Sequence, residues 1–169
     1  MSVLDGGLPR WKREGRPLTD AVAALVTTRA SAAFQPRLDM AMVAAAERVA
    51  RAVAGSGERL VNARSLAQFA GIGGTHDGRP GRIPASAILP ARDLVDAVAM
   101  DWLPPDAIQA RLAPAGLGDP AEPVITCCGG GIAASVTFFA LRLLGRDKVA
   151  LYDNSLLEWS ADPARPMAL

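Results

Sequence analysis

The sequence predicts an α/β domain built on a mostly parallel sheet with helices on both faces. The chain has 169 residues, 50% of them hydrophobic, which is enough to bury the core of one domain. Between residues 123 and 152, a β-rich run, a glycine-rich turn, an apolar helical segment and a second β-rich run follow one another. Such a βαβ unit has parallel strands and a right-handed crossover. Shorter apolar runs and helical patterns alternate before it, as in other α/β proteins.

Local patterns justify the individual elements. Asp39 stands before an apolar stripe with three-and-four spacing, and Gly55 ends that helix. Ser65 caps a second helix, Pro105 begins another at a position that tolerates proline, and Gly145 ends the last. In chain order, the patterns predict a helix over 40–54, a strand over 60–62, a short helix over 65–69, a weak strand over 87–89, helices over 92–98 and 105–112, a strand over 124–127, a buried helix over 133–144 and a strand over 149–152.

Composition and charge argue against several classes of function. With 18 basic and 17 acidic residues, the formal net charge is +1, so we expect no nucleic-acid or membrane partner. No apolar run reaches the roughly 18–20 residues that span a bilayer. One His and two adjacent Cys supply neither a usual zinc site nor a disulfide framework, so we expect no metal and no cofactor. No secretory signal follows Met1, and we expect a cytoplasmic protein.

A short internal repeat links the two ends of the chain. The first copy reads LDGGLPRW from Leu4, and the second reads YDNSLLEW from Tyr152, at an offset of 148 residues. An Arg-Pro pair follows each copy, with one residue gained before the second pair. Such a repeat indicates two copies of one structural unit. We therefore expect residues 1–18 to be the end of one domain, 19–37 to be a linker and 38–166 to be a complete second domain.

Cys128 is the candidate catalytic residue. It follows a predicted strand and precedes a predicted helix, and ligand sites of open α/β sheets form at the carboxyl ends of strands. The next residues form the candidate anion-binding loop: Gly129, Gly130, Gly131, Ile132 and Ala133. Backbone N–H groups in such a loop stabilise an anion, here the Cys128 thiolate, and so favour a nucleophile. The alternative, an inert buried thiol, would not require three glycines after it.

The neighbouring Cys127 is expected to have a different role. Side chains alternate across a strand, so Cys127 should point away from Cys128 and pack in the core. A redox pair of the two thiols is the other interpretation. Adjacent cysteines can pair only in a strained ring, which disfavours it.

These motifs resemble the rhodanese family of sulfurtransferases, in particular the tandem two-domain thiosulfate and 3-mercaptopyruvate sulfurtransferases. The segments that carry the resemblance are LVNARS (60–65), RPGRIP (79–84), VITCCGGGIAAS (124–135) and YDNSLLEW (152–159). The resemblance implies a five-stranded sheet and a transfer of sulfane sulfur through a persulfide on Cys128. It further implies that residues 1–18 are the end of a preceding rhodanese domain that is catalytically silent.

The loop distinguishes this chain from related phosphatases. The six residues from Cys128 to Ala133 match the sulfurtransferase length, whereas the phosphatases of the same fold use one residue more. Tyrosine phosphatases also need an arginine six positions after the Cys to bind phosphate, and that position is Ala134 here. The loop has neither the basic residues of thiosulfate enzymes nor the Gly-Ser-Gly of mercaptopyruvate enzymes, so the donor stays open.

Four other residues are candidates for binding the donor. Arg64 matches a substrate-binding arginine of the tandem enzymes, although Asn62 replaces the Asp that precedes it in the family. Arg82 stands where the family often has His, and Arg79 and His76 lie in the same predicted loop. Each of the four has a plainer interpretation as a solvated or ion-paired side chain.

Three functions remain open at this stage. The first is a sulfurtransferase that moves sulfur from a small donor, thiosulfate or 3-mercaptopyruvate, to a thiophile such as cyanide or a thiol. The second is a truncated, non-catalytic binding protein of the same fold, and the third is the Cys127/Cys128 redox protein. Because one domain of the tandem is nearly absent, we expect its missing surface to be covered by a homodimer.

Overall fold

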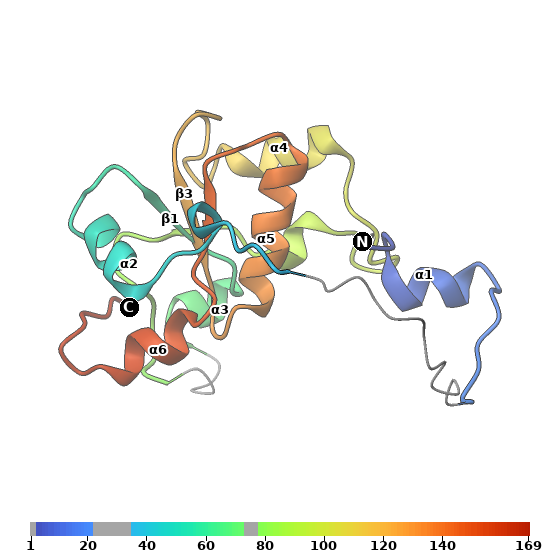
Figure 1. The fold of residues 1–169 in the computed structure, drawn as a ribbon, viewed down its shortest axis with the longest axis horizontal. Helices are drawn as coiled ribbons and strands as arrows, with labels where there is room; N and C mark the ends of the chain where they lie inside the picture. The colour runs from blue at the N-terminus through green and yellow to red at the C-terminus, as the bar shows by residue number, and fades with distance from the viewer. Residues whose placement is uncertain (1–2, 22–34, 73–77) are drawn as a thin grey trace.

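The computed structural model describes residues 3–21, 35–72 and 78–169. Its centre is a parallel four-stranded sheet with the order β2-β1-β3-β4, surrounded by helices (Figure 1). In chain order the elements are α1 (Gly7–Arg13), the 3-10 helix η1 (Met40–Met42), α2 (Ala46–Val53), β1 (Arg59–Asn62), α3 (Leu66–Phe69), β2 (Ala87–Ile88), the 3-10 helix η2 (Ala91–Leu94), α4 (Pro105–Leu112), β3 (Val124–Cys127), α5 (Ile132–Leu143), β4 (Val149–Leu151) and α6 (Ser155–Ala161). The α/β class with a parallel sheet is therefore confirmed.

Alternating strand residues divide the core into two layers. Leu60, Ile125 and Ala150 pack on one face with α2 and α6. Val61 and Val124 pack on the other face with α4 and α5. Because side chains of a strand point alternately to opposite faces, helices cover both sides of the sheet, as predicted.

Within the described residues the sheet has four strands, one fewer than the five that the resemblance implied. At the free edge of β4, Val43 makes only one isolated parallel bridge, to Leu151. The backbone is extended at Val43, but η1 ends one residue before it and α2 begins at Ala46. The two helices leave no room for a longer strand at this edge.

The helix boundaries show where local patterns were insufficient. Asp39 caps as predicted, but it caps η1, and the expected helix over 40–54 is interrupted by the extended stretch before α2. The helix predicted over 92–98 is the shorter η2, because the chain then turns to bridge Val95 with Trp102. By contrast, α4 has the predicted bounds, and the Ser65 capping box begins α3.

The long helix α5 is only partly buried, in contrast to the expectation from its apolar sequence. Ala134, Ala140 and Leu141 are buried against the sheet, whereas Ile132 and Leu143 are more than half exposed. Within the described residues, no helix is both long and apolar enough to cross a membrane.

The N-terminal segment lies at one end of the molecule, where α1 contacts the chain before α4 (Figure 1). The Arg13 guanidinium donates to the Asp101 carboxylate at 2.7 Å and to the carbonyl of Ala99 at 3.0 Å. The Asp5 carboxylate accepts from the backbone N–H of Trp102 at 2.9 Å. These contacts attach the first copy of the repeat to the surface of the domain.

Candidate active site

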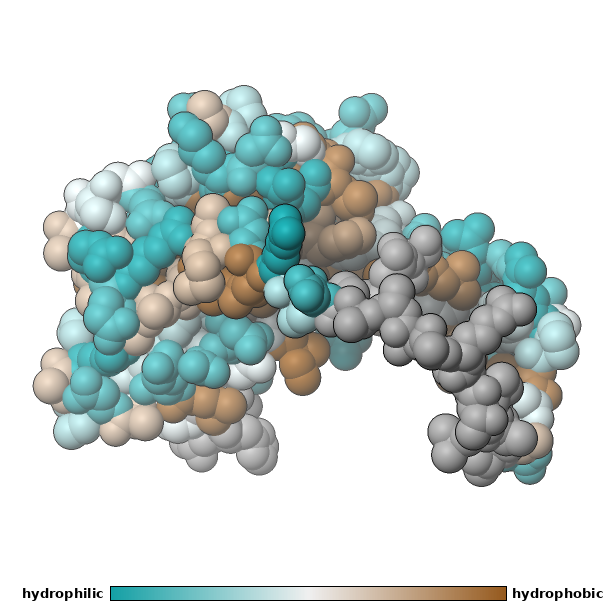
Figure 2. All heavy atoms as spheres, in the orientation of Figure 1, coloured by the Kyte–Doolittle hydropathy of each residue, from teal (hydrophilic) through white to brown (hydrophobic). Residues whose placement is uncertain are grey.

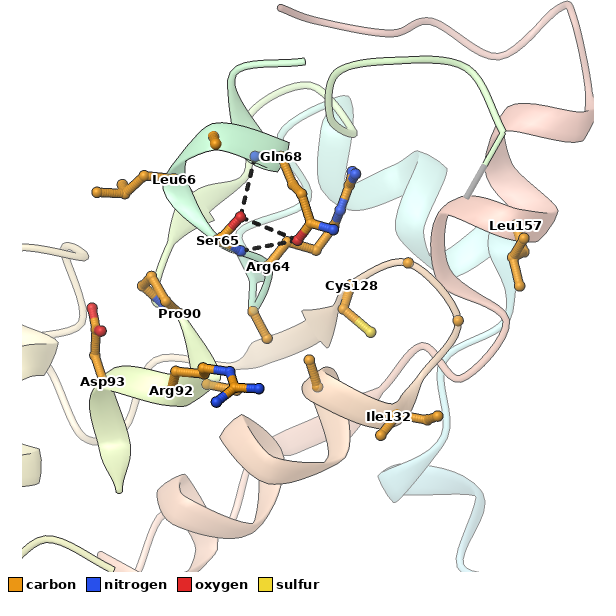
Figure 3. A pocket seen from close by; sticks show the side chains of 16 residues that line it. Arg64, Ser65, Leu66, Gln68, Pro90, Arg92, Asp93, Cys128, Ile132 and Leu157 are labelled. Carbon is orange, nitrogen blue, oxygen red and sulfur yellow. Dashed lines mark hydrogen bonds between the residues drawn. The ribbon is translucent and has the colours of Figure 1, made fainter. Parts of the chain in front are cut away.

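The parallel register brings the carboxyl ends of three strands together. Asn62 pairs with Cys127 across β1 and β3, so the residues that follow these strands lie side by side. A pocket of about 760 Å³ opens at this edge of the sheet (Figure 3). Its walls come from the residues after β1, from α3, from η2, from the start of α5 and from Leu157 of α6, and Cys128 lies among them. The pocket is thus the ligand position expected for an open α/β sheet.

The loop after Cys128 turns the chain directly into α5. Gly131 has φ 86°, and a Cβ at this position would lie 2.3 Å from Oδ1 of Asp153, so no other residue fits without a shift. Because α5 begins at Ile132, the first N–H groups of the helix have no carbonyl partner within it. They and the helix dipole favour a negative charge at this end of the helix. Figure 3 shows the Cys128 sulfur pointing into the turn of this loop.

Ser155 positions Cys128 and is a residue that the sequence analysis missed. Its Oγ accepts a hydrogen bond from the Cys128 backbone N–H at 2.9 Å, donates to the Tyr152 carbonyl at 2.7 Å and lies 4.0 Å from the Cys128 sulfur. Ser155 has φ 49°, a conformation that costs a non-glycine residue about 1 kcal/mol or more. The internal repeat carried a signal, because the residue at the same place in the first copy is Gly7.

The two cysteines lie on opposite faces of the sheet, as predicted. Cys127 packs with Tyr152 and Trp159 in one core layer, and Cys128 belongs to a separate cluster with Ala63 and Ala134. Burial raises the pKa of the Cys127 thiol to about 12, and the neighbouring Cys128 adds to this rise. Cys127 therefore stays protonated near neutral pH, and its side chain is not directed toward Cys128.

Arg64 lines the pocket, but its guanidinium is held by the protein. Nη1 donates to the Gly81 carbonyl at 3.0 Å, and the side chain is buried. Asn62 accepts from the backbone N–H of Arg64 at 3.0 Å through Oδ1. Asn62 thus accepts a hydrogen bond at the end of β1, although it lacks the negative charge of an aspartate.

The remaining candidates lie elsewhere or outside the described residues. The Arg79 guanidinium donates to the carbonyls of Ser160, Asp162 and Arg165, and so holds the chain around the end of α6. The Arg82 guanidinium donates to the Phe69 carbonyl and lies 4.4 Å from the centre of its ring. Neither arginine lines the pocket of Cys128. His76 lies in a segment that is not described.

Arg92 is a second residue that the sequence analysis missed. It belongs to η2, lines the pocket and extends toward α5 in Figure 3, whereas the sequence pattern showed only a helix position. No local signal identified it, because its position depends on β2 ending beside β1. Among the residues that the structure describes, no group of three or more His, Cys, Asp or Glu side chains could hold a metal ion.

Comparison with known proteins identifies the family. Residues 45–162 match the model of the rhodanese-like domain. The chain is 31% identical over 166 residues to a probable 3-mercaptopyruvate sulfurtransferase of Pseudomonas aeruginosa, covering 98% of this chain and 57% of that protein. It is 28% identical over 161 residues to the 3-mercaptopyruvate sulfurtransferase of Homo sapiens, covering 94% of this chain and 52% of the human protein.

A solved structure supports the same assignment. The Tum1 protein of Saccharomyces cerevisiae superposes with a TM-score of 0.78 at 26% identity, over 94% of this chain and 57% of that one. The chain therefore spans a little more than half the length of the relatives it matches. The resemblance seen in the sequence is confirmed, and the chain belongs to the rhodanese-like domain family.

Proposed function

We propose that this chain is a sulfurtransferase that carries sulfane sulfur as a persulfide on Cys128. The observation that carries the proposal is the position of Cys128, in a pocket at the carboxyl end of β3 and immediately before α5. The N–H groups at the start of α5 would stabilise a thiolate or persulfide anion at this position. The relatives named as 3-mercaptopyruvate sulfurtransferases support the same class of reaction.

The reaction has two steps in which sulfur moves and the thiolate is regenerated. The Cys128 thiolate attacks the outer sulfur of thiosulfate, the S–S bond breaks, and sulfite leaves with the bonding electron pair. With 3-mercaptopyruvate, the C–S bond breaks instead, and the thiol proton ends on the carbon of the pyruvate that leaves. A thiophile such as cyanide then attacks the outer sulfur of the persulfide and leaves as thiocyanate.

Mass spectrometry tests the proposal directly. After incubation with thiosulfate or 3-mercaptopyruvate, we expect one added sulfur atom on Cys128, and thiocyanate when cyanide follows. Cys128→Ser should abolish both signals. Cys127→Ala is the matched control and should retain both, because Cys127 packs on the opposite face of the sheet. If the wild type and Cys128→Ser give equal background, the proposal is wrong.

The two alternative functions make different predictions in the same experiment. A non-catalytic protein of this fold would give no persulfide and no thiocyanate with either donor. A dithiol redox protein would lose activity in Cys127→Ala as well as in Cys128→Ser. The separate burial and raised pKa of Cys127 favour the single-thiol mechanism over the redox pair.

The expected homodimer is part of the proposal. Val136, Phe139 and Leu143 form an apolar stripe at helical spacing on α5, outside the pocket, and the last two are exposed. Figure 2 shows apolar surface gathered over the region of α5. We propose that a second copy covers this stripe. Sedimentation should show a dimer that Phe139→Ser weakens, and a monomer at all concentrations would contradict this.

A further inference from the structure

The pocket of Cys128 contains two arginines with different surroundings. The Arg64 guanidinium donates to the Gly81 carbonyl. The Arg92 side chain is exposed and makes no hydrogen bond, ion pair or ring contact with any residue that the structure describes. Arg92 is therefore a cation in the pocket whose donor groups are not occupied by any of the described residues.

The other polar groups of the pocket do not compete for this role. Ser65 and Gln68 are hydrogen-bonded to each other in the capping box. Asp93 is the acidic side chain of the lining, and in Figure 3 it points away from Cys128, whereas Arg92 extends toward α5. A ligand beside Cys128 would therefore find a positive charge at Arg92.

Such a charge would favour the binding of an anionic donor. A thiolate and an anionic donor repel each other, and the loop over residues 129–133 carries no charged side chain that would reduce this repulsion. A guanidinium presents parallel N–H donors that match a carboxylate or the oxygens of a sulfonate-like group. Arg92 lines the pocket and has the charge and the N–H donors to bind the end of the donor that does not react.

We propose that Arg92 binds the anionic group of the sulfur donor and so makes this pocket selective for anionic donors. The inference rests on the proposed function of Cys128, because it assigns a binding group for the donor of that reaction. It goes beyond that proposal by naming the residue and the chemical class that it selects.

Steady-state kinetics provide the first test. Arg92→Gln should raise the KM for thiosulfate and for 3-mercaptopyruvate about tenfold or more, because a charged hydrogen bond is lost, with a smaller effect on kcat. Arg92→Lys should recover part of the loss. Arg111→Gln is the matched control, since Arg111 is an exposed arginine of α4 outside the pocket. With a neutral dialkyl trisulfide, the Cys128 thiolate attacks the central sulfur, one S–S bond breaks and an alkyl thiolate leaves, so the cysteine carries a mixed trisulfide. This reaction should be equally fast in the wild type and in Arg92→Gln.

A binding measurement separates this inference from the proposed function. In the unreactive Cys128→Ser protein, calorimetric titration with thiosulfate and with 3-mercaptopyruvate should show binding of at least one of them that Arg92→Gln weakens about tenfold. Equal binding by both proteins, or no binding of either anion, would overturn the role of Arg92. Absence of persulfide in the wild type, with binding that still depends on Arg92, would overturn the catalytic proposal alone.

Discussion

The two copies of the internal repeat form the same local structure in different surroundings. Helices α1 and α6 begin and end at the same offset of 148 residues that separates the two sequence copies. In each copy the tryptophan Nε1 donates at 2.8 Å to a proline carbonyl, from Trp11 to Pro17 and from Trp159 to Pro166. An arginine also lies over each indole, at 5.2 Å in the first copy and 5.1 Å in the second.

Only the second copy is built into the core. Trp159 is 1% exposed and packs with α2 and the sheet, whereas α1 has no buried residue. The backbone N–H groups of Leu156 and Leu157 donate to the carbonyls of Cys128 and Gly129, so α6 also holds the candidate catalytic loop. The repeat therefore encodes a local motif, and its contribution to stability and function depends on what it packs against. That residues 1–18 are the end of another domain stays a prediction from the repeat.

The largest expected difference between the copies is in stability. Trp159→Ala should lower the free energy of unfolding by about 3–5 kcal/mol, because it leaves a large cavity in the core. Trp11→Ala should change it by about 1 kcal/mol or less, because Trp11 is only partly buried and its helix has no buried residue. Urea unfolding of both variants measures this, with Trp159→Phe as a milder control. Equal losses at the two positions would show that α1 is as much a part of the core as α6.

A second prediction concerns Ser155 and Gly7, which occupy the same place in the two copies and both have positive φ. Ser155→Ala should lower the free energy of unfolding by about 1–3 kcal/mol, because the Cys128 N–H loses its acceptor and is buried. It should also lower kcat for sulfur transfer more than it changes the donor KM, since Ser155 positions the thiol. Ser155→Gly removes the same hydroxyl but relieves the left-handed backbone, so it should regain roughly 1 kcal/mol of stability relative to Ser155→Ala.

Gly7 provides the matched control in the first copy. Its φ is 51°, and a Cβ there would meet only Pro9 Cδ, at 3.9 Å. Gly7→Ser should therefore cost about 1 kcal/mol of backbone strain and leave kcat unchanged. A kcat for Ser155→Gly equal to that of the wild type would contradict the positioning role of the hydroxyl.

Features set by local sequence could be predicted, whereas features set by the pairing of distant segments could not. The turn from β3 to α5 follows from an apolar run, three glycines and an apolar helix, all of which are local, so Cys128 could be placed from sequence alone. Arg92 could not, because only the pairing of β2 with β1 brings η2 to the pocket. Local pattern also failed at Val43, where a bridge to the sheet edge interrupts the predicted helix.

Because Cys127 is buried in the core beside α6, the free energy of unfolding should fall as the pH rises above neutral. The thiol has a pKa of about 12 in the folded protein, against about 8.5 in an unfolded chain. Between these values the unfolded state binds fewer protons than the folded state, so stability falls as pH rises. At pH 9.5, one unit above the unfolded pKa, the loss is about 1.4 kcal/mol.

Unfolding curves between pH 7 and 10 test this dependence. Cys127→Ala removes the titrating thiol, so its stability should fall less over this range than that of the wild type, whatever its stability at pH 7. Trp11→Ala provides the comparison from the first copy, because no thiol packs against α1, and it should keep the pH dependence of the wild type. Parallel curves for the wild type and Cys127→Ala would show that the thiol is not protected by the core.

The smallest expected effect lies at the attachment of α1. Arg13 and Asp101 form an ion pair whose side chains are 45% and 27% exposed, so Arg13→Gln should cost only about 0.2–1 kcal/mol of global stability. Its local effect should be larger, because the contacts of Arg13 hold α1 against the chain before α4. Amide hydrogen exchange within α1 should therefore become faster in Arg13→Gln, while exchange within α6 stays unchanged. If exchange in α1 is unaffected, the hydrogen bond from the Trp102 N–H to Asp5 is sufficient to hold the helix, and the ion pair contributes only surface charge.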